Sequence, residues 1–240
     1  MSTVAVYAPG GRNPIRTLSG GLGTRGDLAF APNGDLYVAY AFSTYSRVAV
    51  YAPGASHPMR VITSGITEPV SLAFDSKGDL YVANQTYPGS VTVYAPGRKL
   101  PKRTLHEHFV KLTAIAIDAA DNLYVADEGS YGQETRIVVY PRGHSRPSRV
   151  ITRGISGAVA LALDSLGNLY VANFFINQHN AQRGYVSVYA PGSDKPAYVL
   201  GRDDCDEFFL GVDSQNNLYV GHRSLNGAIT VYPPGSNNPS

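Results

Sequence analysis

The tripeptide Leu-Tyr-Val occurs five times in the 240 residues of the chain, beginning at residues 36, 80, 123, 169 and 218. Successive copies are separated by 44, 43, 46 and 49 residues. A period of about 40–50 residues is the length of one propeller blade. A unit of this size cannot bury both of its faces alone, so neighbouring units must stack into one continuous core.

Each repeat predicts four short strands. The first is apolar and ends in Asp in four of the five repeats, and a turn rich in Gly, Asn and Asp connects it to the Leu-Tyr-Val strand. A third strand of the form VxVY is closed by Ala-Pro-Gly or a relative, and a further Pro opens a short fourth strand at the sheet edge. The sequence therefore predicts an all-β fold, a β-propeller of five four-stranded antiparallel blades.

The third-strand motif occurs once more than the others, and its six copies end at Tyr7, Tyr51, Tyr94, Tyr140, Tyr189 and Tyr232. We predict that residues 1–240 form a single propeller domain in which N-terminal strands within residues 3–18 close the last blade. Residues 15–18 would then be its fourth strand beside residues 229–232. This closure predicts a monomer. The alternatives are closure by a second chain, which would give a dimer, and a longer propeller of which the chain is a fragment.

The succession of LAxD, Gly-[Asp/Asn]-Leu-Tyr-Val-Ala-[Asp/Asn], VxVY and a short edge strand resembles the NHL-repeat propellers and their gluconolactonase-like relatives over nearly the whole chain. The resemblance implies a fold and no single activity, because related propellers are hydrolases, lyases, lectin-like binders and docking platforms. It also implies a divalent cation (Ca, Mg or Zn) at the ends of the second strands, held by Asn84, Asp127 and Asn173. The alternative role of these side chains is hydrogen bonding to nearby backbone.

Loop lengths vary at one place in the repeat. Every interval from a third-strand Tyr to the next Leu-Tyr-Val Tyr is 30 residues, whereas the return intervals are 14, 13, 16, 19 and 13. All variation thus lies between the second and third strands, on the face that also carries the connections between blades. This pattern favours one asymmetric site on the variable face, over the central channel.

Two segments on that face have the composition of a binding site. The longest variable loop, residues 173–185, mixes aromatic, amide, His and Arg side chains. The connection at residues 105–108 reads Leu-His-Glu-His, which would place two imidazoles on one side of an extended stretch. The predicted ligand-binding residues are His106, His108, Asn173, Phe174, Phe175, His179, Arg183 and His222. Their alternative role is ordinary loop packing. No catalytic residue is assigned, because no familiar catalytic motif is present.

Composition excludes several partners. The formal net charge is +2 and the basic residues are scattered, which argues against nucleic acid. No apolar stretch approaches the length of a membrane span, so no membrane partner is expected. A single cysteine, Cys205, excludes an internal disulfide but does not decide the compartment. The chain is expected to be soluble, either secreted or periplasmic with its signal removed, or cytoplasmic.

Two functions fit these features. The first is a binding propeller that holds a small molecule, glycan or protein on its variable face. The second is a propeller enzyme of the lactonase, hydrolase or lyase type that uses a divalent cation. An enzyme would usually show convergent carboxylates or His on several blades, and the chain has only a partial set, so the sequence favours binding. Loops that differ in every blade disfavour a repeat lectin.

Overall fold

The computed structural model describes residues 2–22, 26–41, 45–106, 108–129, 135–176, 182–201, 207–222 and 228–240. The chain divides into two compact units, Met1–His108 and Phe109–Ser240, called unit 1 and unit 2 below. The regular elements of the described residues are all β-strands. None of these residues belongs to a helix that could cross a membrane.

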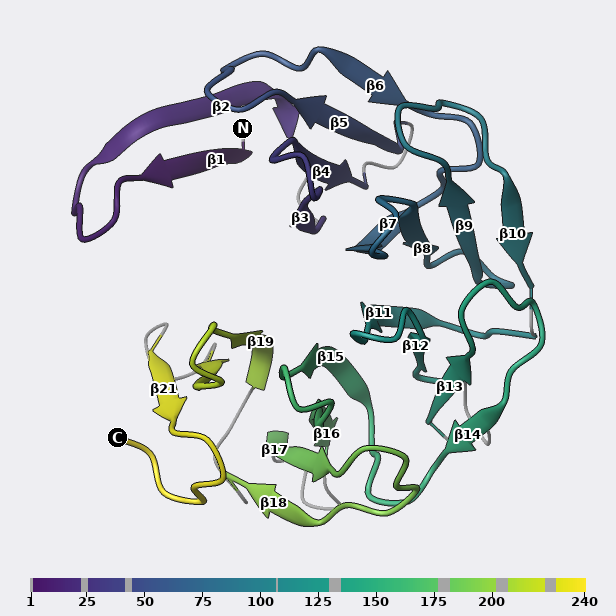
Figure 1. Cartoon of the computed structure of the whole chain (residues 1–240), viewed down its shortest axis with the longest axis vertical. Helices are drawn as coiled ribbons and strands as arrows, with labels where there is room; N and C mark the ends of the chain where they lie inside the picture. The colour runs from purple at the N-terminus through teal and green to yellow at the C-terminus, as the bar shows by residue number, and fades with distance from the viewer. Residues whose placement is uncertain are drawn as a thin grey trace. The chain divides into compact units, whose positions relative to one another are not determined.

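Unit 1 contains two complete blades (Figure 1), and in both the strands are hydrogen-bonded in chain order. The first blade consists of β3 (Leu28–Phe30), β4 (Leu36–Tyr40), β5 (Arg47–Tyr51) and β6 (Arg60–Ile62). The second consists of β7 (Pro69–Phe74), β8 (Leu80–Asn84), β9 (Ser90–Tyr94) and β10 (Arg103–Leu105). All pairs are antiparallel.

Unit 2 contains three blades. The third blade of the chain consists of β11 (Leu112–Ile117), β12 (Leu123–Asp127), β13 (Arg136–Tyr140) and β14 (Arg149–Ile151). The fourth consists of β15 (Ala158–Leu163), β16 (Leu169–Ile176), β17 (Gln182–Tyr189) and β18 (Tyr198–Leu200). The fifth consists of β19 (Glu207–Val212), β20 (Leu218–His222) and β21 (Ile229–Tyr232). The predicted all-β, five-bladed propeller fold is confirmed, but this last sheet has three strands among the described residues instead of four.

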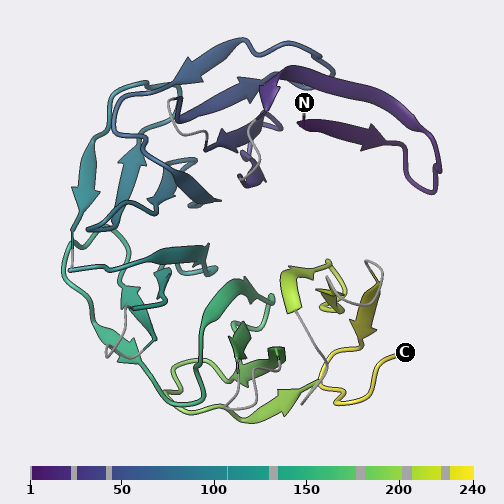
Figure 2. The same ribbon diagram turned by 180° about the vertical axis from the view of Figure 1, so that it is seen from behind.

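The N-terminal strands β1 (Ser2–Tyr7) and β2 (Pro14–Leu22) pair with each other in unit 1 (Figure 2). Val4 faces Leu18 in this pair as Val48 faces Ile62 in the first blade, so the pair repeats the third and fourth strands of a blade. Leu18 packs with Val4 and Val6 against the first blade. Pairing of residues 15–18 with β21 would involve both units and stays a prediction.

The Asp that ends a first strand closes the following hairpin turn. In the second blade, Asp75 Oδ1 accepts hydrogen bonds from the backbone N–H of Lys77 (3.0 Å) and Asp79 (2.9 Å). The same two-bond pattern recurs at the other three positions, which are Asp118, Asp164 and Asp213. These carboxylates therefore hold turns and are not available for a site at the variable end.

In the second and fourth blades, the tyrosine at the end of the third strand binds the connection that enters the blade. Tyr94 Oη donates to the carbonyl of Ser64 at 2.5 Å, and Tyr189 Oη donates to the carbonyl of Arg153 at 2.6 Å. Both rings are almost fully buried. Burial favours the uncharged phenol and raises the pKa of Tyr189 to about 12.

Replacing Tyr189 by Phe should flatten the loss of stability at alkaline pH. Between the ordinary tyrosine pKa of 10.0 and the raised value of about 12, the unfolded chain loses this proton first and the folded chain keeps it. The free energy of unfolding therefore falls as pH rises through that window. Urea unfolding at several pH values across the window measures the slope. Tyr87→Phe, at a side chain that is 82% exposed, is the matched control and should leave the slope unchanged. An equal slope for Tyr189→Phe and the original chain would contradict this role.

Candidate functional site

The amides at the ends of β8 and β16 hold the connections that enter their blades. Asn84 Oδ1 accepts from the Thr67 N–H at 2.9 Å, and its Nδ2 donates to Thr92 Oγ1 at 3.0 Å and to the Gly65 carbonyl at 3.3 Å. Both blades have Ser or Thr in the middle of the third strand, and these hydroxyls also bind the connection. The Asn84 amide is therefore occupied at both ends by its own blade.

Asn173 repeats this arrangement in the fourth blade. Its Oδ1 accepts from the Ser156 N–H at 2.8 Å, and its Nδ2 donates to the Val171 carbonyl at 3.0 Å and to Ser187 Oγ at 3.2 Å. The side chain has no exposed surface. Asn173 was predicted as both a ligand-binding and a metal-binding residue, and its observed contacts are those of a residue that holds the connection in place.

Asp127 binds the connection that enters the third blade, with a carboxylate in place of the amide. Its Oδ1 accepts from the N–H groups of Val110 and Lys111, each at 3.0 Å. Its Oδ2 accepts two bonds from the Arg136 guanidinium, at 3.1 Å from Nε and 3.0 Å from Nη2. Such a two-bond ion pair compensates the charge of a carboxylate that is only 1% exposed.

His222 occupies the same repeat position in the fifth blade. Its Nε2 is 2.8 Å from Thr230 Oγ1, which corresponds to the bond between Asn84 and Thr92. The buried Nδ1 has no hydrogen-bond partner among the described residues. The connection that an Asn would bind at this position comprises residues 202–206, which lie outside the described residues.

The predicted site residues thus divide between several places. His106 and His108 are exposed at the end of unit 1, and His179 lies outside the described residues. In unit 2, Asp127, Asn173 and His222 each bond within their own blades. No three His, Cys, Asp or Glu side chains of the described residues gather where they could hold a metal ion. The cation site implied by the resemblance stays a prediction.

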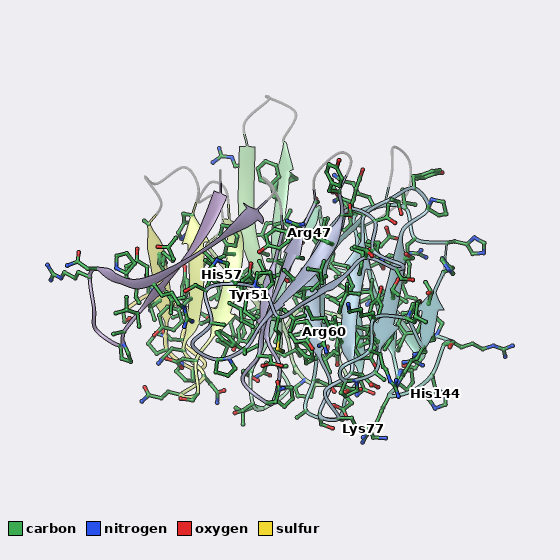
Figure 3. All side chains as sticks on the ribbon, turned by 90° about the horizontal axis from the view of Figure 1, so that it is seen from above. Arg47, Tyr51, His57, Arg60, Lys77 and His144 are labelled. Atoms are coloured by element: carbon green, nitrogen blue, oxygen red, sulfur yellow. The ribbon has the colours of Figure 1, made fainter. Side chains whose placement is uncertain are left out.

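Phe175 and Arg183 do come together, on the long hairpin of the fourth blade. β16 and β17 each have eight residues, whereas the corresponding strands of the second blade have five, and the hairpin extends past the other strands of unit 2 (Figure 3, pale green). Phe175 pairs with Arg183 and Asn173 pairs with Tyr185, so all four side chains lie on the same face of the sheet. The rings of Phe175 and Tyr185 pack edge to face with centroids 5.9 Å apart.

This face borders a cavity of about 440 Å³, called the hairpin groove below. The groove lies toward the outer strands β17 and β18, and its lining residues are Gly154, Phe175, Arg183, Gly184, Tyr185, Pro196 and Val199. Arg183 is the charged residue of this set, and the other walls are apolar or aromatic. The volume lies within the range of about 300–1,000 Å³ typical of small-molecule sites.

The sequence predicted only part of the groove. Phe175 and Arg183 were candidates because they lie in the longest variable loop, and Tyr185 belonged to the same loop. Gly154, Pro196 and Val199 were missed because they lie in segments of constant length, which gave no sign of a special role. The sequence signal that could have pointed to Gly154 is the register of the third strand, β17. Ser187 and Tyr189 of that strand donate hydrogen bonds to the connection in which Gly154 lies.

Comparison with known proteins supports the fold class. No family model matches the chain, and no curated protein matches it. Among solved structures, it is similar to the hydrazine synthase of Kuenenia stuttgartiensis, with a TM-score of 0.66 and 16% sequence identity. The match covers 98% of this chain and 71% of the other. At this identity the likeness shows the fold alone, and the class of protein is a β-propeller.

Proposed function

We propose that the protein is a ligand-binding propeller of the NHL-repeat or gluconolactonase-like kind whose site is the hairpin groove. The observation that supports this best is the groove itself, at the blade with the longest segment between its second and third strands. Binding requires a concave apolar surface with a few polar groups to orient the ligand, and the groove supplies both.

The lining residues suggest the chemistry of the ligand. Phe175 and Tyr185 offer aromatic surface, and Pro196 and Val199 add apolar walls. The Arg183 guanidinium is suited to a planar anion, because it donates two parallel hydrogen bonds to a carboxylate. The groove therefore fits a small molecule with an aromatic or apolar body and one carboxylate.

Shortening the hairpin should remove binding while the blade stays folded. In the test, residues 174–184 are replaced by a linker with the sequence of residues 85–89, because Asn173 pairs with Tyr185 as Asn84 pairs with Ser90. The buried core residues of the fourth blade lie outside the replaced segment, so the melting temperature should change little. Titration calorimetry with naphthoate as the probe should show binding to the original chain and at least about tenfold weaker binding to the shortened one.

A charge-matched pair of probes separates the role of Arg183 from that of the aromatic walls. Arg183→Gln should weaken naphthoate binding by about tenfold and leave the binding of the neutral naphthamide unchanged. If the shortened chain folds and binds naphthoate as before, the ligand site lies elsewhere. If it unfolds, the long hairpin is part of the framework, and the proposal then depends on Arg183→Gln alone.

A further inference from the structure

A second cavity, of about 240 Å³, lies between the two blades of unit 1. It is lined by residues of the repeated turns, at the end of the blades away from the variable loops; Arg60 and Lys77 are labelled in Figure 3. Its lining residues are Ala31, Pro32, Asn33, Asp35, Tyr37, Arg60, Lys77, Gly78, Pro96 and Gly97. Two cations, one carboxylate and the Asn33 amide line a space whose other residues are alanine, glycine, proline and tyrosine.

Arg60 is held in a fixed position at this cavity. Its Nη2 donates to Tyr37 Oη at 2.7 Å, and its guanidinium carbon lies 5.9 Å from the centre of the Tyr37 ring. The Arg60 Nε is buried and has no hydrogen-bond partner among the described residues. A guanidinium that is already oriented loses little conformational entropy when it binds an anion.

At the equivalent place between the third and fourth blades, a carboxylate of the protein balances the charge of the arginine. There Arg149 takes the position of Arg60, and its Nη1 lies 3.3 Å from the Ser193 carbonyl and 3.4 Å from Asp194 Oδ1. In the second blade, the residue that corresponds to Asp194 is Lys99. The counterpart of Lys77 in the fourth blade is Leu166, so the cation at position 77 is not a requirement of the turn.

We propose that the cavity of unit 1 binds a small oxyanion of the phosphate type between the Arg60 guanidinium and the Lys77 ammonium group. The anion takes the place that Asp194 fills beside Arg149 in the other unit. Asp35 is the opposing charge in the lining, and its Oδ2 accepts a hydrogen bond from Asn33 Nδ2 at 2.9 Å. The small volume, below that of a typical small-molecule site, suits a single anionic group.

Calorimetric titration of the full chain with inorganic phosphate, at constant ionic strength, tests this site. Lys77→Leu introduces the residue of the fourth blade and should weaken phosphate binding by at least about tenfold, because one charge-assisted hydrogen bond is lost. Lys99→Asp should weaken it similarly, because it places a carboxylate where Asp194 lies beside Arg149. Lys99→Ala is the matched control and should bind phosphate within about twofold of the original chain.

A parallel titration with phenyl phosphate distinguishes two sources of the anion. Comparable or tighter binding of phenyl phosphate, with the same sensitivity to Lys77→Leu, identifies the phosphate group of a larger molecule as the ligand. Binding of inorganic phosphate alone identifies the free ion. The proposal is overturned if the original chain binds neither compound at millimolar concentrations, or if Lys77→Leu binds as the original chain does while keeping its melting temperature.

Discussion

Deletion of residues 1–18 should lower the free energy of unfolding by at least about 4 kcal/mol, because it removes a whole layer of apolar packing. Leu18, Val4 and Val6 cover the first-blade cluster that includes Tyr51. For a chain of this length, such a loss lowers the melting temperature by roughly 8–16 °C. Circular dichroism on heating measures it.

Single substitutions in β2 test whether the loss of stability comes from the packing of buried side chains. Leu18 has no exposed surface, and Leu18→Ala should cost about 2–5 kcal/mol. Ile15 in the same strand is 69% exposed, and Ile15→Ala should change stability by less than about 0.5 kcal/mol. Equal melting temperatures for the deleted and original chains would show that β1 and β2 do not support the first blade.

Substitution of Asn173 should produce the second large effect. Asn173→Ala leaves the Ser156 N–H and the Val171 carbonyl without the bonds they make now, which should cost about 2–4 kcal/mol. Asn173→Asp should also destabilise the blade, because a carboxylate can accept from Ser156 but cannot donate to Val171 or Ser187. Urea unfolding measures both variants.

The same two variants distinguish hydrogen bonding from metal binding. If Asn173 holds the connection, calcium should not restore the stability of Asn173→Asp, and a chelator should not lower that of the original chain. A metal ligand would behave in the opposite way, because a carboxylate is a stronger ligand for calcium than an amide. Rescue of Asn173→Asp by calcium would therefore contradict the structural role.

The repeat was sufficient to predict the blades because each of its elements is specified locally. Leu-Tyr-Val and VxVY are short runs of β-branched, aromatic and other apolar residues, as strands buried on both faces require, and the Asp at the end of the first strand predicts the turn that follows it. The partner of β2 could not be predicted in the same way. The motifs of β1 and β21 are both suitable partners for residues 15–18, so local pattern does not decide between them.

The candidate site was harder to predict because the length of a loop indicates where a site could lie but does not show which other residues contact that loop. The amides at the strand ends were considered for both a cation and backbone contacts, and only the folded chain shows that Asn84 and Asn173 use both ends of the amide within their blades. Phe175 and Arg183 were found through the long loop. The groove that they line also needs Pro196 and Val199. These two residues lie outside the long loop, in segments that have a similar sequence and length in every repeat.

The structure of the full chain crystallised with naphthoate tests the proposed ligand site most directly. The hairpin groove predicts electron density for the naphthalene ring against Phe175 and Tyr185, with the carboxylate within hydrogen-bond distance of the Arg183 guanidinium. Density for the ligand at another place, with the groove empty and not covered by a neighbouring molecule, would contradict the proposal that this hairpin is the binding site.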